Sequence, residues 1–290
     1  MKKIILIGDS IRMGYDKYVK EAFSETAEVY YPADNCRFAT YIIRFVHEWK
    51  KKGEWPDDVD LVHWNAGLWD CLRLFEEEPH TPIEVYAYYI ERICIRIKKI
   101  CPDAKYYMHK TWAYESDFVS PNFENYNSDQ KYMYECVTDA NNKAAQSINA
   151  DIIPAGDVIQ YLRENTKEFD YKNGGLSFNR DGFHLTLDYG RYTATLTWCC
   201  KILGKDAFDV QFVPQMCDEN VANVIKDAVN RSDIVLPGLH NVENYMAAFS
   251  AVDGLVSKEN CLRIAKTFCG VEHRIELIRI KDGVKFYNDS

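Results

Sequence analysis

The chain has 290 residues, of which 47% are hydrophobic and 27% charged, and its formal net charge is −9. This composition is typical of a globular protein and excludes a collagen-like, coiled-coil or largely disordered chain. The excess of acidic residues disfavours general nucleic-acid binding, which depends on Lys and Arg contacts to phosphates. The length suits one α/β domain and a smaller second part.

The start of the sequence predicts neither a signal peptide nor a membrane segment. Residues 1–3 are basic enough for a signal peptide, but the apolar run at 4–7 is too short for its core. No apolar run approaches the ~20 residues of a membrane span. We therefore expect a cytoplasmic protein with no membrane partner. The ten cysteines include no Cys-x-x-Cys pair, which favours reduced core cysteines over disulfides or a metal site.

Strand-like and helix-like stretches alternate up to residue 205. The predicted strands are 3–7, 28–31, 61–64, 105–109 and 151–154. The predicted helices are 15–23, 40–51, 82–100, 129–149 and 187–203. Strands separated by helices indicate a parallel sheet with helices on both faces. In that class of fold, functional sites form at the carboxyl ends of the strands.

The pattern changes after Gly204. Here the sequence predicts strands at 207–213 and 233–236, and helices at 220–229, 241–252 and 258–268. An Asp-Gly pair at 282–283, between apolar runs at 274–280 and 284–287, predicts a β-hairpin. We therefore predict a domain at 1–205, a connecting segment at 206–230 and a small α+β appendage at 231–290.

Two short motifs carry candidate chemistry. Ser10 follows the first strand in a Gly-Asp-Ser sequence, where a serine can be a nucleophile or the cap of the next helix. Asp181 and His184 are three residues apart, before the 187–203 helix, so one turn can place both on the same side. A nucleophilic serine needs a base, and the base needs an orienting carboxylate. Alternatively, Asp181 is a helix cap and His184 a surface residue.

Together these motifs resemble the SGNH (GDSL-type) hydrolase family over residues 1 to about 205. The resemblance implies a flavodoxin-like three-layer α/β/α sandwich with a parallel sheet. It also implies a serine esterase that hydrolyses esters through an acyl-serine intermediate, with no metal and no organic cofactor. By position, Ser10 is then the nucleophile, His184 the general base and Asp181 the residue that orients His184 in a catalytic triad.

The family completes its oxyanion hole with a glycine and an asparagine from two further loops, and here the match is imperfect. Cys36 stands at the glycine position, where only its backbone N–H is required. After the third strand, Asn65-Ala-Gly67-Leu-Trp69-Asp replaces Gly-x-Asn-Asp, so Asn65 becomes the expected amide donor. The implied oxyanion donors are the N–H of Ser10, the N–H of Cys36 and the Asn65 amide. This variant resembles a subgroup seen in bacterial carbohydrate-linked esterases.

A substrate pocket is predicted beside these strand ends. Its candidate residues are Asp9, Gly67, Trp69 and His109, with Trp112 and Tyr114 on the same rim. An aromatic rim suits a sugar ring or an aryl group, although loop aromatics can also simply cover the end of a sheet. We expect a small-molecule ester substrate, such as an acetylated carbohydrate, and no nucleic-acid partner. A homo-oligomer remains open.

Residues 231–290 resemble a different family, the Mur ligases, with UDP-N-acetylmuramoyl-alanine–D-glutamate ligase as the nearest type. The stretches 231–248, 270–276 and 283–290 carry the resemblance. The printed sequence contains no Gly-x-x-x-x-Gly-Lys-(Ser/Thr) phosphate loop, so we do not expect ligase chemistry. The leading hypothesis is an O-deacetylase of a carbohydrate or other small ester, fused to a ligase-like fragment. The alternatives are a catalytically degenerate binding or scaffold protein and a fragment related to cell-wall ligases.

Overall fold

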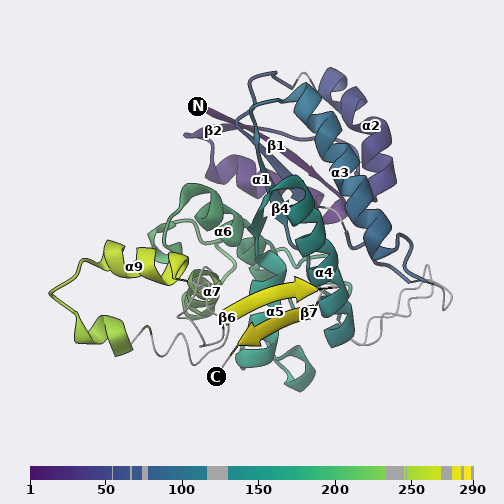
Figure 1. The fold of residues 1–290 in the computed structure, drawn as a ribbon. Helices are drawn as coiled ribbons and strands as arrows, with labels where there is room; N and C mark the ends of the chain where they lie inside the picture. Colours follow the sequence, from purple (N-terminus) through teal and green to yellow (C-terminus); the bar gives the residue numbers. More distant parts are fainter. Residues whose placement is uncertain are drawn as a thin grey trace. The chain divides into compact units, whose positions relative to one another are not determined.

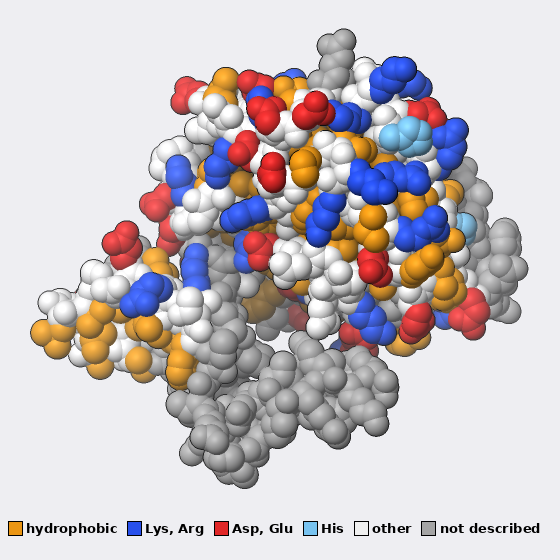
Figure 2. Space-filling model, turned by 45° about the horizontal axis from the view of Figure 1, so that its top comes forward, with side chains coloured by type: hydrophobic (Ala, Val, Ile, Leu, Met, Phe, Trp, Pro, Cys, Tyr) orange, Lys and Arg blue, Asp and Glu red, His pale blue; other side chains and the backbone are white. Residues whose placement is uncertain are grey.

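The structure, a computed structural model, describes residues 1–53, 55–65, 67–73, 78–115, 130–232, 245, 247–268, 276–281 and 284–288. The chain divides into two compact units, residues 1–226 and 227–290. Within the described ranges no helix is both long and apolar enough to cross a membrane, and the nine cysteines found there are free thiols. Figure 2 shows a face of mixed character, on which basic, acidic and hydrophobic side chains are interspersed.

A five-stranded parallel sheet forms the centre of the first unit (Figure 1). Its strands lie in the order β2-β1-β3-β4-β5. They are β1 (Lys2–Gly8), β2 (Ala27–Tyr30), β3 (Leu61–Asn65), β4 (Lys105–His109) and β5 (Asp151–Ile153). This is the flavodoxin-like order, so the predicted fold class is confirmed. All five carboxyl ends meet at one edge of the sheet, because every pairing is parallel.

Helices cover both faces of this sheet. Strand β2 lies on one side of β1 and the later strands lie on the other side. Right-handed crossovers therefore place the helices before and after β2 on opposite faces of the sheet. The first group is α1 (Ser10–Ala22), which packs on α6 (Tyr189–Leu203), and α5 (Ala155–Asn165), which also packs on α6. The second group is α2 (Ala39–Lys52), α3 (Ile83–Ile100) and α4 (Gln130–Ile148), packed in succession (Figure 1).

Strand β1 lies in the middle of the hydrophobic core. Its residues 4–7 are each at most 1% exposed, and a strand buried on both faces has the continuous apolar sequence seen here. Burying each such side chain contributes about 1.5–3 kcal/mol. The neighbouring β3 is equally buried but contains His63 and Asn65, which are both 0% exposed. Buried polar groups of this kind are costly unless they are hydrogen-bonded, so these two residues are candidates for a special role.

Most predicted elements of the first unit agree with the structure to within two residues, although α1 begins at Ser10 and not at residue 15. Helix α5 was not predicted. The strand expected at 207–213 is wrong: residues 207–209 form a 3₁₀ turn, in which the Asp206 side chain accepts the N–H of Phe208 at 2.9 Å. The helix predicted at 220–229 is confirmed as α7 (Glu219–Arg231), which ends one residue beyond the predicted connecting segment.

The described part of the second unit contains α9 (Lys258–Thr267) and a hairpin of β6 (Glu276–Lys281) and β7 (Val284–Asn288). The two strands pair antiparallel, which confirms the predicted hairpin. Ser257 caps α9, because its hydroxyl accepts the N–H of Asn260 at 3.3 Å. The predicted strand at 233–236 and the ligase-like residues 233–244 lie outside the described residues. Of the helix predicted at 241–252, residues 245 and 247–252 are described, and 245 and 247–251 are helical.

Candidate active site

The Gly-Asp-Ser sequence forms the turn from β1 into α1. A Cβ atom on Gly8 would lie 2.5 Å from the carbonyl oxygen of Asn65, so only glycine lets the ends of β1 and β3 approach this closely. Asp9 is the N-cap of α1, and its Oδ1 accepts the N–H of Ile11 at 2.9 Å. Packing and capping thus account for the first two residues, and Ser10 is left as the first residue of the helix.

Ser10, His184 and Asp181 form a continuous hydrogen-bonded chain. His184 Nε2 lies 2.8 Å from Ser10 Oγ, and His184 Nδ1 lies 2.7 Å from Asp181 Oδ2. Burial raises the pKa of Asp181, but hydrogen bonds from the ring and the amide of His184 outweigh it, so the pKa lies below its ordinary value. Ionised Asp181 can therefore hold a proton on Nδ1, which leaves Nε2 to accept the Ser10 hydroxyl proton.

Two predicted oxyanion donors lie beside this serine. The N–H of Ser10 is in the first turn of α1, where the helix supplies no acceptor and its dipole favours negative charge. Asn65 pairs in register with Gly8, so its amide lies next to the Gly-Asp-Ser turn. Asn65 Nδ2 is 2.7 Å from His109 Nδ1, and Asn65 Oδ1 is buried without a hydrogen-bond partner in the described structure. The Asn65 amide nitrogen carries two protons, so His109 takes one of them and the other is left for an oxyanion.

The prediction for Cys36 is wrong. Its backbone N–H donates to the carbonyl oxygen of Gly8 at 3.2 Å. A backbone amide has a single proton, so this hydrogen bond takes the donor that the oxyanion would need. The Cys36 side chain is fully buried, and burial raises the pKa of its thiol to about 12. Cys36 thus ties the loop after β2 to the end of β1.

Burial separates the predicted pocket residues. Trp69 is 38% exposed, whereas Asp9 is 1% and His109 0% exposed. The side chains of Asp9 and His109 are therefore closed to solvent in this structure: the first caps α1 and the second contacts Asn65. Gly67 is also buried, with a φ of +147°. Trp69 is the member of this set whose side chain is open to a ligand.

Trp69 belongs to an aromatic edge that we define as Phe38, Trp69 and His80. The Phe38 ring centroid lies 6.4 Å from that of Trp69 and 5.0 Å from that of His80. Buried Asp70 joins the two loops that carry them, because it accepts the N–H of Ala39 at 3.2 Å and the hydroxyl of Thr81 at 2.7 Å. The edge is thus a connected structure built on the loops after β2 and β3.

Trp112 and Tyr114 were predicted to lie on the rim of the pocket. They do not, because they are 0% and 3% exposed. Both instead hold the turn that carries His184. Trp112 Nε1 donates to the carbonyl of Phe183 at 2.9 Å, and the Tyr114 ring packs against that of Phe183 at 5.3 Å. Next to them, the N–H of Glu115 donates to the carbonyl of Gly182 at 2.8 Å.

Sequence reasoning missed two further residues of this region. Asn179 Nδ2 donates to the carbonyl of Phe183 at 2.8 Å, and Arg163 Nη2 donates to Asn179 Oδ1. Arg163 follows Ile159 by four residues and so lies on the buried face of α5. A charged residue at an apolar position of a helix indicates a special role, but this pattern is visible only if α5 is predicted.

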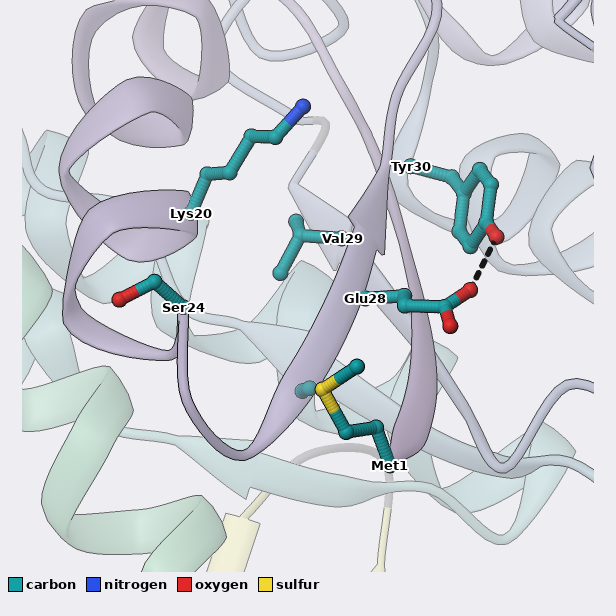
Figure 3. Close-up of a pocket in the computed structure, with 7 residues that line it drawn as sticks. Met1, Lys20, Ser24, Glu28, Val29 and Tyr30 are labelled. Atoms are coloured by element: carbon teal, nitrogen blue, oxygen red, sulfur yellow. Dashed lines mark hydrogen bonds between the residues drawn. The ribbon is translucent and has the colours of Figure 1, made fainter.

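A surface hollow of about 350 Å³ lies elsewhere in the first unit (Figure 3). Lys20 lines it from the last turn of α1, Ser24 from the turn after α1, and Val29 from β2. Ten residues of helix, about 15 Å, separate Lys20 from Ser10. The hollow is therefore distinct from the Ser10 site. Among the described residues no group of three or more His, Cys, Asp or Glu side chains is arranged to hold a metal ion.

Solved structures share this fold. A DUF4886 family protein from Bacteroides uniformis ATCC 8492 superposes with a TM-score of 0.60 at 22% identity, over 79% of this chain and 93% of that one. The acetyl xylan esterase AlAXEase gives 0.51 at 17% identity, over 68% and 98%. At these identities the similarity shows a shared fold alone, and an acetyl xylan esterase is among the proteins that have this fold.

Sequence comparisons match two kinds of protein. UDP-N-acetylmuramoylalanine–D-glutamate ligase from Clostridium beijerinckii is 57% identical over 65 residues, which are 22% of this chain and 14% of the ligase. The chain thus spans about one seventh of that ligase, and the predicted resemblance to a ligase fragment is confirmed. The family profile described as "Domain of unknown function (DUF4886)" matches residues 82–232, slightly more than half of the chain. The chain therefore belongs to the DUF4886 family.

Proposed function

We propose that this protein is a serine ester hydrolase that forms an acyl intermediate on Ser10. The observation that carries the proposal is the hydrogen-bonded chain from Ser10 Oγ through His184 to Asp181, with contacts of 2.8 and 2.7 Å. These are the distances at which a base can activate a nucleophile and a carboxylate can orient that base. The hydrogen bond between Ser10 and His184 joins residues that are 174 positions apart in the sequence.

The first half-reaction transfers the acyl group to the enzyme. His184 Nε2 takes the proton of Ser10 as Oγ attacks the ester carbonyl, and the carbonyl oxygen becomes an oxyanion. The N–H of Ser10 and the Asn65 amide stabilise that negative charge, assisted by the N-terminus of α1. His184 then returns the proton to the leaving alcohol, and the C–O bond to the alcohol breaks.

The second half-reaction restores the free serine. His184 takes a proton from a water molecule, which attacks the acyl carbon, and Ser10 leaves with the proton that His184 gives back. Ionised Asp181 keeps the imidazole in the Nδ1–H tautomer in both halves and stabilises the imidazolium between them. Every proton in this scheme moves among Ser10, His184, the substrate and water.

For the substrate, we propose an acetyl ester of a carbohydrate. The aromatic edge supports this choice, because Trp69 offers a partly exposed flat surface beside the loops of the site, and such surfaces can pack against a sugar ring. One structurally similar protein is named an acetyl xylan esterase. The net charge of −9 weakly disfavours polyanionic carbohydrates.

The test compares hydrolysis of p-nitrophenyl acetate and p-nitrophenyl butyrate by the wild type and by Ser10→Ala. We expect the wild type to cleave the acetyl ester faster, and the variant to lose at least about 10⁴-fold in kcat, as when other triads are broken. Release of acetate from acetylated xylan and acetylated monosaccharides then tests the proposed substrate class.

Ser24→Ala is the matched control, because Ser24 is exposed and lines the separate hollow at the other end of α1. It should hydrolyse both esters at the wild-type rate. Equal slow rates for the wild type and Ser10→Ala on every ester would contradict the proposal. A loss of activity in Ser24→Ala alone would instead place the active site at the hollow.

A further inference from the structure

The loop that carries Asp181 and His184 has no helix or strand to hold it. Between Ser177 and Leu185 the chain is folded back on itself by a single isolated bridge between Asn179 and Leu185. The N–H of Arg180 donates to the carbonyl of His184 at 2.9 Å. We call residues 177–185 the triad loop. Because it lacks a secondary-structure scaffold, its conformation depends on contacts with its surroundings.

Three hydrogen bonds reach the tip of the triad loop, directly before His184. They come from Trp112 Nε1 and Asn179 Nδ2 to the carbonyl of Phe183, at 2.9 and 2.8 Å, and from the N–H of Glu115 to the carbonyl of Gly182, at 2.8 Å. Two of these donors lie in the segment that follows β4, and the third is part of the loop itself. The position of the tip therefore depends on how the triad loop and the segment after β4 are held against each other.

The side chain of Arg163 joins them. It projects from α5 and is 2% exposed. Its Nη1 donates to the carbonyl of Ala113 at 3.0 Å, and its Nη2 donates to Asn179 Oδ1. Nη2 also lies 3.8 Å from Glu115 Oε1, and the guanidinium carbon lies 5.8 Å from the centre of the Tyr171 ring. One planar fork thus spans the segment after β4 and the triad loop.

We propose that Arg163 is a positioning residue for the triad: it fixes the triad loop against the segment after β4, so that His184 stays within hydrogen-bonding distance of Ser10. This role rests on the proposed function of Ser10, His184 and Asp181. Arg163 contacts none of these three, and it acts through Asn179 and the segment 113–115.

The chemistry of the site explains why an arginine is used. Its planar fork can donate to two acceptors in fixed directions while its flat face packs on an aromatic ring. A lysine has one nitrogen, and it cannot span Ala113 and Asn179 in the same way. A buried cation also needs a counter-charge, which Glu115 supplies at 14% exposure. Glu115 itself accepts the hydroxyl of Ser177, so the counter-ion is tied to the triad loop as well.

The test uses the full chain and a fluorophosphonate probe, in which Ser10 Oγ displaces fluoride from phosphorus. The labelling rate, followed by mass spectrometry, reports the activation of Ser10 without knowledge of the substrate. The variants are Arg163→Met, which removes both donors, and Arg163→Lys, which keeps the charge. We expect labelling to slow about 100-fold in the first, the cost of a displacement near 1 Å in an active site, and about tenfold in the second, which loses one of two contacts.

Lys110→Met is the matched control. Lys110 is 6% exposed and its Nζ lies 2.8 Å from Oδ2 of the partly exposed Asp157, so it also joins the end of β4 to α5 through an ion pair. Its side chain bonds to Asp157 and to no residue of the triad loop among the described contacts. The control should lose stability as Arg163→Met does, but it should label Ser10 at nearly the wild-type rate. Equal labelling in the control and in both Arg163 variants would overturn the proposal.

The ¹⁵N spectrum of the histidine rings gives a second, independent readout. The wild type should show His184 as the Nδ1–H tautomer held by Asp181, identified by its absence in His184→Gln. In Arg163→Lys, which keeps the buried charge and should fold, this signal should shift toward a mixture of tautomers. If it does not shift, Arg163 has no positioning role. If the wild type keeps the tautomer but does not label, the proposed nucleophile fails while the positioning role stands.

Discussion

Asp9 is the most unusual titratable residue next to the candidate nucleophile. It is 1% exposed, and its Oδ2 has no hydrogen-bond partner among the described residues. Burial raises the pKa of Asp9 to about 7, although the hydrogen bond from the Ile11 N–H and the charge of Arg12 oppose the shift. Asp9 therefore holds its proton in the folded protein at pH values where an unfolded chain has released it.

This difference predicts how stability depends on pH. Between about pH 4 and pH 7 the folded state binds the proton of Asp9 and the unfolded state does not, so the free energy of unfolding falls as pH rises, by up to ~1.4 kcal/mol per pH unit. Asp9→Asn keeps a capping side chain and cannot ionise. Its stability relative to the wild type should therefore increase between pH 5 and pH 8, measured by urea unfolding.

Asp188→Asn is the control for this experiment, because Asp188 caps α6 by accepting the N–H of Tyr189 at 2.6 Å. It tests the exchange of a capping carboxylate for an amide at a second helix. If Asp9→Asn and the wild type give parallel curves of unfolding free energy against pH, the proton on Asp9 does not affect stability, and the prediction is wrong.

The candidate site shows which residue-scale features a sequence reveals. Ser10, Asp181 and His184 were predicted because their types and order along the chain resemble a known family, and the structure brings all three together. The engagement of the Cys36 N–H could not be predicted, because its acceptor is a carbonyl 28 residues away, on Gly8. A sequence pattern records burial and side-chain type, but it does not record which carbonyl a backbone amide meets.

At the scale of elements, periodicity predicted most strands and helices because burial imposes it. The continuous apolar run at 4–7 favours a strand buried on both faces, and it forms the centre of β1. Helix α5 was missed because only its N-cap, Pro154, separates it from β5, so no loop in the sequence marks where the helix starts. Because α5 was not predicted, the buried position of Arg163 within it could not be predicted either.

The start of α5 gives a prediction at this scale. A Cβ atom on Gly156 would lie 1.8 Å from the carbonyl oxygen of Thr111, so Gly156→Ala must push α5 away from the segment after β4. We expect a destabilisation of about 1–3 kcal/mol, as for other overpacked sites, although alanine is otherwise the better helix former. Thermal and urea unfolding measure this change.

Gly14→Ala is the control for this substitution. Gly14 lies inside α1, and the nearest atom to an added Cβ there is 3.9 Å away, on Arg191. This variant should gain up to about 1 kcal/mol from helix propensity alone. Opposite signs for the two variants would show that contact, and not propensity, determines the residue at 156. A Gly156→Ala protein as stable as the wild type would mean that α5 is not held this closely.

At the scale of the whole molecule, the chain combines parts with different relatives. The DUF4886 profile ends at residue 232, and the first compact unit ends at residue 226. The predicted domain end at 205 is earlier than both. Residues beyond 205 belong to the fold of the first unit: Ala207, Ala222 and Ile225 are 0% exposed, and the N–H of Asp218 donates to Tyr189 at 2.9 Å.

Two truncated chains test this boundary. A chain of residues 1–232 keeps all of α7, which ends at Arg231, and should unfold cooperatively and label Ser10 at the rate of the full chain. A chain of residues 1–205 loses three fully buried side chains and the partner of Tyr189. Each buried methylene that is lost costs about 0.8 kcal/mol of stability, and the Tyr189 hydroxyl that loses its hydrogen-bond partner costs more. The 1–205 chain should therefore melt at a lower temperature and be cut faster by protease. Equal stability of the 1–232 and 1–205 chains would support a domain that ends at residue 205. Loss of labelling in 1–232 would mean that the ligase-like part contributes to the active site.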